Sequence, residues 1–188
     1  MAQTLTETAI CTNALYMLGE SHITSLLDDS LRARVCNSNF GAARDQCLQD
    51  MRPNFAKSYK TLAQAVTAPL FEWDARYPLP ADYLSLICTY PDKIEFEIVE
   101  TDLYCNEAAM SIKYIKRVTD TTKWTPLFAD AVTYKLAERI APALKDAARE
   151  GMTTMYQESR RLTKADTGLE TGSKPIMADD FIDVRYIN

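Results

Sequence analysis

The chain of 188 residues is 47% hydrophobic and 25% charged, so it can bury a core of its own without a disulfide or a metal. Its formal net charge is −5, and the acidic excess is spread over both halves of the chain. Proteins that grip duplex DNA usually carry a basic stretch, and this sequence has none, which argues against a phosphate-binding role.

The five cysteines never form a Cys-x-x-Cys pair, which predicts reduced thiols and a protein made in the cytoplasm. Residues 1–7 have neither the basic nor the apolar region of a signal peptide. No apolar run reaches the roughly 18 residues that a membrane-spanning helix needs. We therefore expect neither a signal peptide nor a membrane partner.

Two helices are predicted first, at about 4–19 and 30–52. Thr4 and Glu7 fit a capping box, and Gly19 suits the left-handed residue that closes a helix. The second helix has a potential cap among residues 28–30. Its apolar residues recur at spacings of three and four, which places them on one helix face: Ala33, Cys36, Phe40, Ala43, Cys47 and Met51.

A third, shorter helix is predicted at about 54–64, after Pro53 ends the second one. Phe55, Tyr59 and Leu62 would mark its apolar side. The following segment, 69–82, contains three prolines, so we expect neither a regular helix nor a central strand there.

From residue 83 the apolar period changes to two, which is typical of strands. Ile94, Phe96 and Ile98 alternate with acidic residues, and residues 102–105 and 110–118 indicate two further strands. The strand region of about 83–118 therefore predicts one small antiparallel sheet of three or four strands.

Two helices are predicted after the strands, at about 125–142 and 146–165. Thr125 followed by Pro126 is a strong helix start, because proline fits the first helical position. The fold class we expect is α+β and mainly helical: a bundle of four to five helices, with the small sheet inserted between the N-terminal and C-terminal helices. Residues 1–166 would form this domain.

Residues 167–188 are predicted to be a linker and an extended C-terminal arm. The arm (176–188) is apolar again after a Gly/Ser-containing linker, and an apolar tail either packs on its own domain or docks on a partner. The large apolar residues that would make either contact are Ile176, Met177, Phe181, Ile182, Val184, Tyr186 and Ile187.

No catalytic, cofactor-binding or metal-binding residues can be assigned from the sequence. His22 is the single histidine, and a metal site built on histidine needs further ligands that the sequence does not supply. Five glycines leave little room for a phosphate-cradling loop. The adjacent pairs Asp28–Asp29 and Asp179–Asp180 are most simply caps or solvated charges. We expect a protein that is not an enzyme and has no cofactor.

A collinear set of residues runs through most of the chain: Ile10, Asn13, Leu18, Gly19, Ile23, Asp28, Ala33, Cys36, Phe40, Arg44, Pro53, Phe55, Tyr77, Pro78, Pro80, Tyr83, Phe128, Asp130, Tyr134, Leu136 and Tyr156. In this order of residues the chain resembles the head-to-tail adaptor proteins of tailed bacteriophages, the tail tubular protein A type. One difference is visible, because family members often have Pro-Trp-Asn-Phe-Ala where Asn54 here follows Pro53 directly.

This resemblance implies a structural virion protein of the head-to-tail connector. Such adaptors form a ring between the portal protein and the tail nozzle or tail tube, and the ring extends the DNA channel. The resemblance implies that the C-terminal arm clasps the portal and that copies form a ring of twelvefold symmetry. DNA would pass through the acidic ring without sequence-specific binding.

Two interpretations from other classes stay open. A small cytosolic enzyme of unrecognised type would need a deep pocket with convergent polar groups. A regulatory module that binds a peptide through an exposed sheet edge would bind as a single copy.

Overall fold

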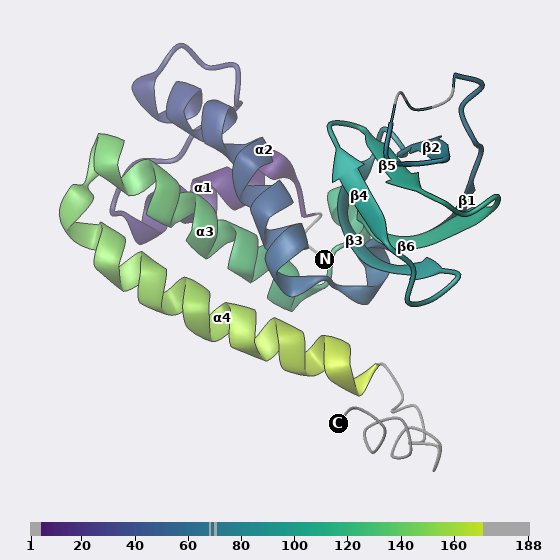
Figure 1. The fold of residues 1–188 in the computed structure, drawn as a ribbon. Coiled ribbons are helices and arrows are strands. Elements are labelled where there is room, and N and C mark those ends of the chain that lie inside the picture. The colour runs from purple at the N-terminus through teal and green to yellow at the C-terminus, as the bar shows by residue number, and fades with distance from the viewer. Residues whose placement is uncertain (1–4, 68, 70, 171–188) are drawn as a thin grey trace.

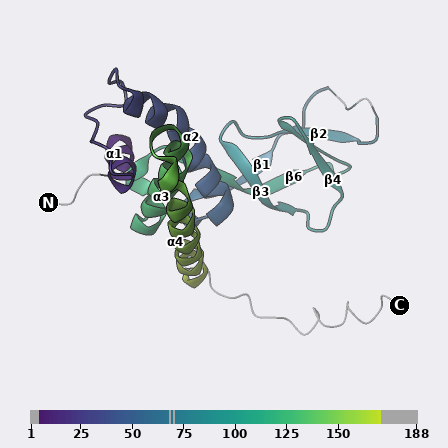
Figure 2. The same ribbon diagram turned by 90° about the vertical axis from the view of Figure 1, so that its left-hand side faces the viewer.

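The computed structural model describes residues 5–67, 69 and 71–170, and its helices and strands lie on opposite sides of the molecule (Figures 1 and 2). The helical lobe consists of α1 (Glu7–Met17), α2 (Leu31–Met51), α3 (Pro126–Leu144) and α4 (Arg149–Leu169). Helix α4 packs along α3, and α3 in turn contacts α1 and α2, so α3 is the central helix of this lobe.

Local capping explains where the helices begin. Ser30 Oγ accepts the Ala33 N–H at 3.2 Å, and Thr125 Oγ1 accepts the Phe128 N–H at 3.3 Å with Pro126 at the first helical position. Each bond satisfies an N–H that the first helical turn leaves unpaired. The cap of α1 is Thr6, whose Oγ1 accepts the Ala9 N–H, so the capping box predicted two residues earlier is wrong.

The helix ends also follow from the backbone. Gly19 has φ +74° and closes α1 as predicted. Arg52, before Pro53, has φ 50° and ends α2. Every residue predicted for the buried face of α2 is buried.

The expected single sheet is wrong, because the strands form two three-stranded antiparallel sheets. Sheet A has the order β1 (Lys57–Leu62), β6 (Met110–Lys116), β3 (Tyr83–Tyr90). Sheet B has the order β2 (Ala75–Pro78), β5 (Asp102–Cys105), β4 (Phe96–Val99). The two sheets enclose a second hydrophobic core, separate from that of the helices, which contains Tyr77, Leu103, Ile112 and Tyr114.

The predicted helix at 54–64 is also wrong. A short turn of 3₁₀ helix at Asn54–Ala56 leads directly into β1, which pairs with β6 over its whole length. The side chains of Tyr59 and Thr61 lie outside, and Leu62 is buried in the core between the sheets. Pairing with a distant strand therefore decides the conformation of residues whose spacing also fits a helix.

The last helix is longer than predicted, because α4 continues to Leu169 and includes the first residues of the expected linker. Helix α3 likewise passes Pro142 and ends at Leu144. The C-terminal arm lies outside the described residues.

The two lobes are joined by polar contacts of α2 with the strands. Arg117, directly after β6, donates from Nε to Asp45 Oδ2 at 2.8 Å, and Arg44 Nε donates to the other oxygen of Asp45 at 2.8 Å. Gln49 Nε2 donates to the backbone oxygen of Leu84 in β3 at 2.9 Å. These bonds fix sheet A against the helical lobe.

Candidate interaction surfaces

A buried polar cluster connects α2, α3 and α4. Tyr156 Oη donates to Asp50 Oδ2 at 2.8 Å, and Lys135 Nζ lies 4.7 Å from the centre of the Tyr156 ring. The same Nζ donates to Glu138 Oε2 at 2.9 Å. Burial, the neighbouring Cys47 and the Asp50 carboxylate raise the pKa of Tyr156 above its usual range.

This cluster holds the helices together and is poorly suited to acid–base chemistry at neutral pH. Burial raises the pKa of the Cys47 thiol to about 12, so the thiol stays protonated and unreactive. The raised pKa of Tyr156 keeps its hydroxyl protonated, as its role of hydrogen-bond donor requires. We therefore interpret the cluster as the clamp that attaches α4 to the body.

Replacing Tyr156 with phenylalanine tests this clamp. The variant keeps the buried ring but loses the bond to Asp50, so unfolding should become easier by about 1 kcal/mol. Urea denaturation of the Tyr156→Phe variant measures the change, with Tyr16→Phe on an exposed ring (56%) as the control. Equal midpoints for the two variants would show that the clamp does not stabilise the fold.

Helix α4 carries a row of exposed apolar side chains beside its buried face. Met155, Leu162 and Leu169 follow one another at intervals of seven residues and are exposed by 48%, 44% and 88%. Positions seven apart lie close to one line along a helix. No residue of the described chain covers this row, and the row runs toward Glu170, where the described chain ends.

The exit point of the arm is fixed by side-chain contacts at the end of α4. Asn54 Nδ2 donates to Glu170 Oε2 at 2.8 Å, and Lys57 Nζ donates to Asn54 Oδ1. Glu170, the last described residue, therefore lies beside the start of β1. The predicted portal-binding residues Ile176, Met177, Phe181, Ile182, Val184, Tyr186 and Ile187 all lie outside the described residues.

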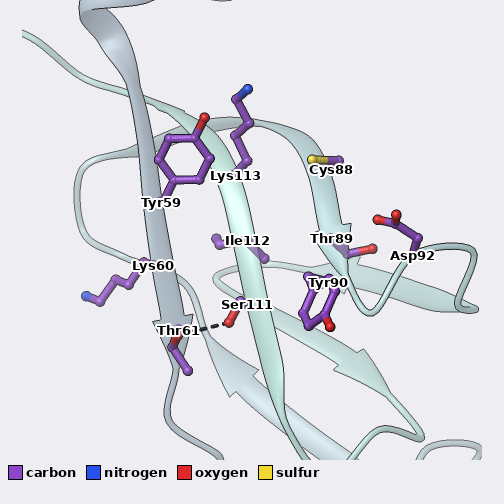
Figure 3. Close-up of a pocket in the computed structure, with 10 residues that line it drawn as sticks. All are labelled: Tyr59, Lys60, Thr61, Cys88, Thr89, Tyr90, Asp92, Ser111, Ile112 and Lys113. Carbon is purple, nitrogen blue, oxygen red and sulfur yellow. Dashed lines mark hydrogen bonds between the residues drawn. The ribbon is translucent and has the colours of Figure 1, made fainter. Parts of the chain in front are cut away.

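The outer face of sheet A forms an open hollow of about 390 Å³ (Figure 3). Tyr59, Lys113 and Cys88 form one row across the three strands, and Thr61, Ser111 and Tyr90 form the next row. Lys113 Nζ lies 5.1 Å from the centre of the Tyr59 ring, and Thr61 and Ser111 share a hydrogen bond of 2.9 Å. Tyr59 and Tyr90 are exposed by 74% and 72%, so this face is both aromatic and accessible.

Charge is segregated between the two sheets, a feature that the order of residues alone does not reveal. The strands of sheet A contain Lys57, Lys60, Lys113 and Lys116 and no acidic residue. The strands of sheet B contain Glu97, Asp102 and Arg76. The register places Lys57 and Lys113 on the face of Tyr59 and places Lys60 and Lys116 on the face of Ile112, so sheet A is basic although the overall charge of the chain is negative.

A second open hollow, of about 480 Å³, lies over sheet B and is lined by Phe71, Trp73, Arg76, Glu97 and Tyr104 among others. Trp73 Nε1 and Arg76 Nε are buried there without a hydrogen-bond partner in the described part of the chain. Among the residues that the structure describes, no hydrogen bond joins a nucleophile to a base in either hollow.

His22 and Asp28, which the sequence analysis also considered, make local contacts in the loop between α1 and α2. His22 lies in the loop between α1 and α2, with its ring 6.5 Å from that of Tyr16. Asp28 accepts bonds from the N–H groups of Thr24 and Ser25 and from the Thr24 hydroxyl. These bonds close a turn between Thr24 and Asp28. The bonds from Ser25 and Thr24 also hold the pKa of Asp28 below its usual value.

Within residues 5–67, 69 and 71–170, no group of three or more His, Cys, Asp or Glu side chains could hold a metal ion. In the same part of the chain, no helix is both long enough and apolar enough to cross a membrane.

Comparison with known proteins gives no relative from which a function could be transferred. The sequence matches no model of a protein family. It also matches no curated protein.

Proposed function

We propose that this protein is a head-to-tail adaptor of a tailed bacteriophage, a structural virion protein that binds the portal as a ring and extends the DNA channel toward the tail nozzle. Its function would be mechanical, with no catalytic step. The collinear resemblance of residues in α1, α2, α3 and α4 to such adaptors motivates the proposal.

The observation that carries the proposal is the exposed apolar row of α4. Met155, Leu162 and Leu169 lack cover within the described chain, and the row leads to an arm that is itself rich in large apolar residues. Soluble proteins seldom leave such surface uncovered unless a partner covers it. A ring gives every copy two neighbours, and a portal gives the arm a surface to dock on.

The charge of the protein is compatible with a DNA channel. At −5 per chain, a ring of several copies repels the phosphates of DNA rather than binding them. DNA would then move through the ring without displacing its counterions, because the 26 acidic side chains of each copy outnumber its 21 Lys and Arg side chains.

Co-sedimentation with the portal protein of the same phage tests the proposal. The expected result is co-migration of the two purified proteins, whereas a portal from an unrelated phage does not retain this protein. A protein that fails to associate with its own portal at micromolar concentration would contradict the proposal and favour the peptide-binding alternative, for which the hollow of sheet A supplies a surface.

A further inference from the structure

Strand β1 presents an open edge close to where the arm begins. In the order β1–β6–β3, β1 pairs only with β6, so no strand within the described residues occupies its other side. The contacts among Glu170, Asn54 and Lys57 place Glu170, the last described residue, at the start of this strand. The described chain thus ends beside a strand edge that no described strand occupies.

The length of the chain beyond Glu170 is sufficient to reach along this edge. The ten residues 171–180 can extend to about 33 Å, since an extended chain advances roughly 3.3 Å per residue. The six residues of β1 cover about 20 Å. Residues 181–187 can therefore reach either end of β1 and run along it in either direction.

Charge distinguishes β1 from the other three edge strands of the described sheets, β3, β2 and β4, because β1 is the one that contains lysine. Strand β4 contains Glu97, and Glu95 and Glu100 lie just before and just after it. The arm brings Asp179, Asp180 and Asp183, which these carboxylates would repel. The edge of β1 offers Lys57 and Lys60 instead, and sheet A has no acidic residue in its strands.

The alternation of side chains in the arm matches the two sides of sheet A. In an extended strand Ile182, Val184 and Tyr186 would point to one face, because they alternate along the chain. The exposed residues Tyr59 and Thr61 likewise lie on one face of β1. Asp183 would point to the opposite face of the arm, just as Lys60 alternates with Tyr59 and Thr61 in β1. The Lys60 side chain points outward from the edge of β1 (Figure 3). In the register that places Ile182, Val184 and Tyr186 on the face of Tyr59, Asp183 lies on the face of Lys60, so this register is the one that we expect an added strand to adopt.

From these four observations we infer that residues 181–187 dock on β1 of their own chain as a fourth strand of sheet A. Lysines on an edge strand normally discourage pairing with other chains. Residues 179–187 contain three Asp and one Arg, a net formal charge of −2, so the segment complements these lysines, and the lysines favour it over neutral or basic segments. The tether keeps the local concentration of the segment on the order of millimolar, which favours its own chain over a second copy.

Docking on β1 would regulate the proposed adaptor function, and this consequence depends on that function. The same apolar side chains cannot cover Tyr59 and the portal at once, so the arm must leave β1 before it clasps the portal. A Lys60→Glu variant should then bind the portal more tightly, because its arm is released.

Amide hydrogen exchange of residues 57–62 in the protein without portal tests the inference. In an antiparallel pair every second N–H of β1 points away from β6. If the arm is docked more than about 90% of the time, these amides are open for less than about a tenth of the time. We therefore expect them to exchange at least about tenfold faster after deletion of residues 171–188. Val184→Pro should match the deletion because proline removes a donor and fixes φ, whereas Ser173→Pro in the linker should have no effect.

A second pair of variants tests whether the charge of Lys60 contributes to docking of the arm. Lys60→Glu should accelerate exchange in β1, and Lys123→Glu, on a lysine 64% exposed in the helical lobe, should not. Identical exchange of β1 in the full chain and in the deletion would overturn the inference, and protection that disappears on dilution would assign the edge to the arm of a second copy instead. Because no portal is present, either failure leaves the proposed adaptor function standing.

Discussion

Deleting residues 171–188 is expected to abolish binding to the portal while leaving a folded protein. The described part of each hydrophobic core is built from residues up to Tyr156, and we expect these residues to keep the shortened chain folded. Loss of an arm that clasps a partner through several large apolar residues should weaken binding at least about a hundredfold, or roughly 2.7 kcal/mol. Titration of labelled protein against portal rings measures the affinity, and circular dichroism monitors the fold.

A matched pair of variants separates the apolar contacts of the arm from its charges. Replacing Ile182, Val184 and Tyr186 with serine should reproduce the deletion, because buried apolar anchors contribute most of the affinity at such contacts. Replacing Asp183 and Arg185 with serine should change the affinity much less, since exposed charges contribute little. Undiminished binding by the deletion variant would show that the portal contacts another surface, with the row on α4 as the next candidate.

Replacing Phe128 with alanine should strongly destabilise the helical lobe. Phe128 is fully buried, with its ring centre 5.1 Å from those of both Phe55 and Trp124 in edge-to-face contacts. Trp124 in turn stacks on Phe40 of α2, so the ring connects α3, α2 and the turn before β1. Removing a buried phenylalanine ring costs about 3–5 kcal/mol through lost burial and the cavity left behind.

Thermal unfolding provides the measurement for this variant. For a chain of this length about 1 kcal/mol shifts the midpoint by roughly 2–4 °C, so Phe128→Ala should melt about 10 °C lower. Phe71→Ala is the control, because its ring is 73% exposed. Similar shifts for the two variants would mean that the aromatic cluster does not hold the helical lobe together.

The helical lobe was largely predictable because its signals are local. The cap at Ser30, the Thr125–Pro126 start and the apolar spacing of α2 each depend on residues within a few positions of one another. The strand of 102–105 was also predicted at its observed bounds. Such features do not require knowledge of what lies across the molecule.

The incorrect predictions, of a helix in place of β1 and of one sheet in place of two, concern strands that depend on distant partners. Tyr59 and Leu62 follow Phe55 at helical spacing, yet Tyr59 pairs with Lys113 and Leu62 with Met110 in β6. The split into two sheets is equally non-local, since sheet B combines strands of four residues each from separate parts of the chain. Short strands carry too few alternations to reveal which sheet they join.

The surfaces were hidden from the sequence for the same reason. The four lysines of sheet A come from β1 and β6 and are separated along the chain by acidic residues that fold elsewhere. The clamp around Tyr156 combines Asp50, Lys135 and Tyr156 from three helices. Only the fold brings these side chains together, whereas the apolar arm was visible as a continuous segment.

The mass of single portal rings, measured with and without this protein, tests the adaptor role most directly. An adaptor ring predicts one discrete increase of about twelve times the mass of one chain, 21.2 kDa, because copies that follow the symmetry of the portal fill every site. An unchanged mass, or an increase of one chain per portal ring, would contradict a ring-forming adaptor.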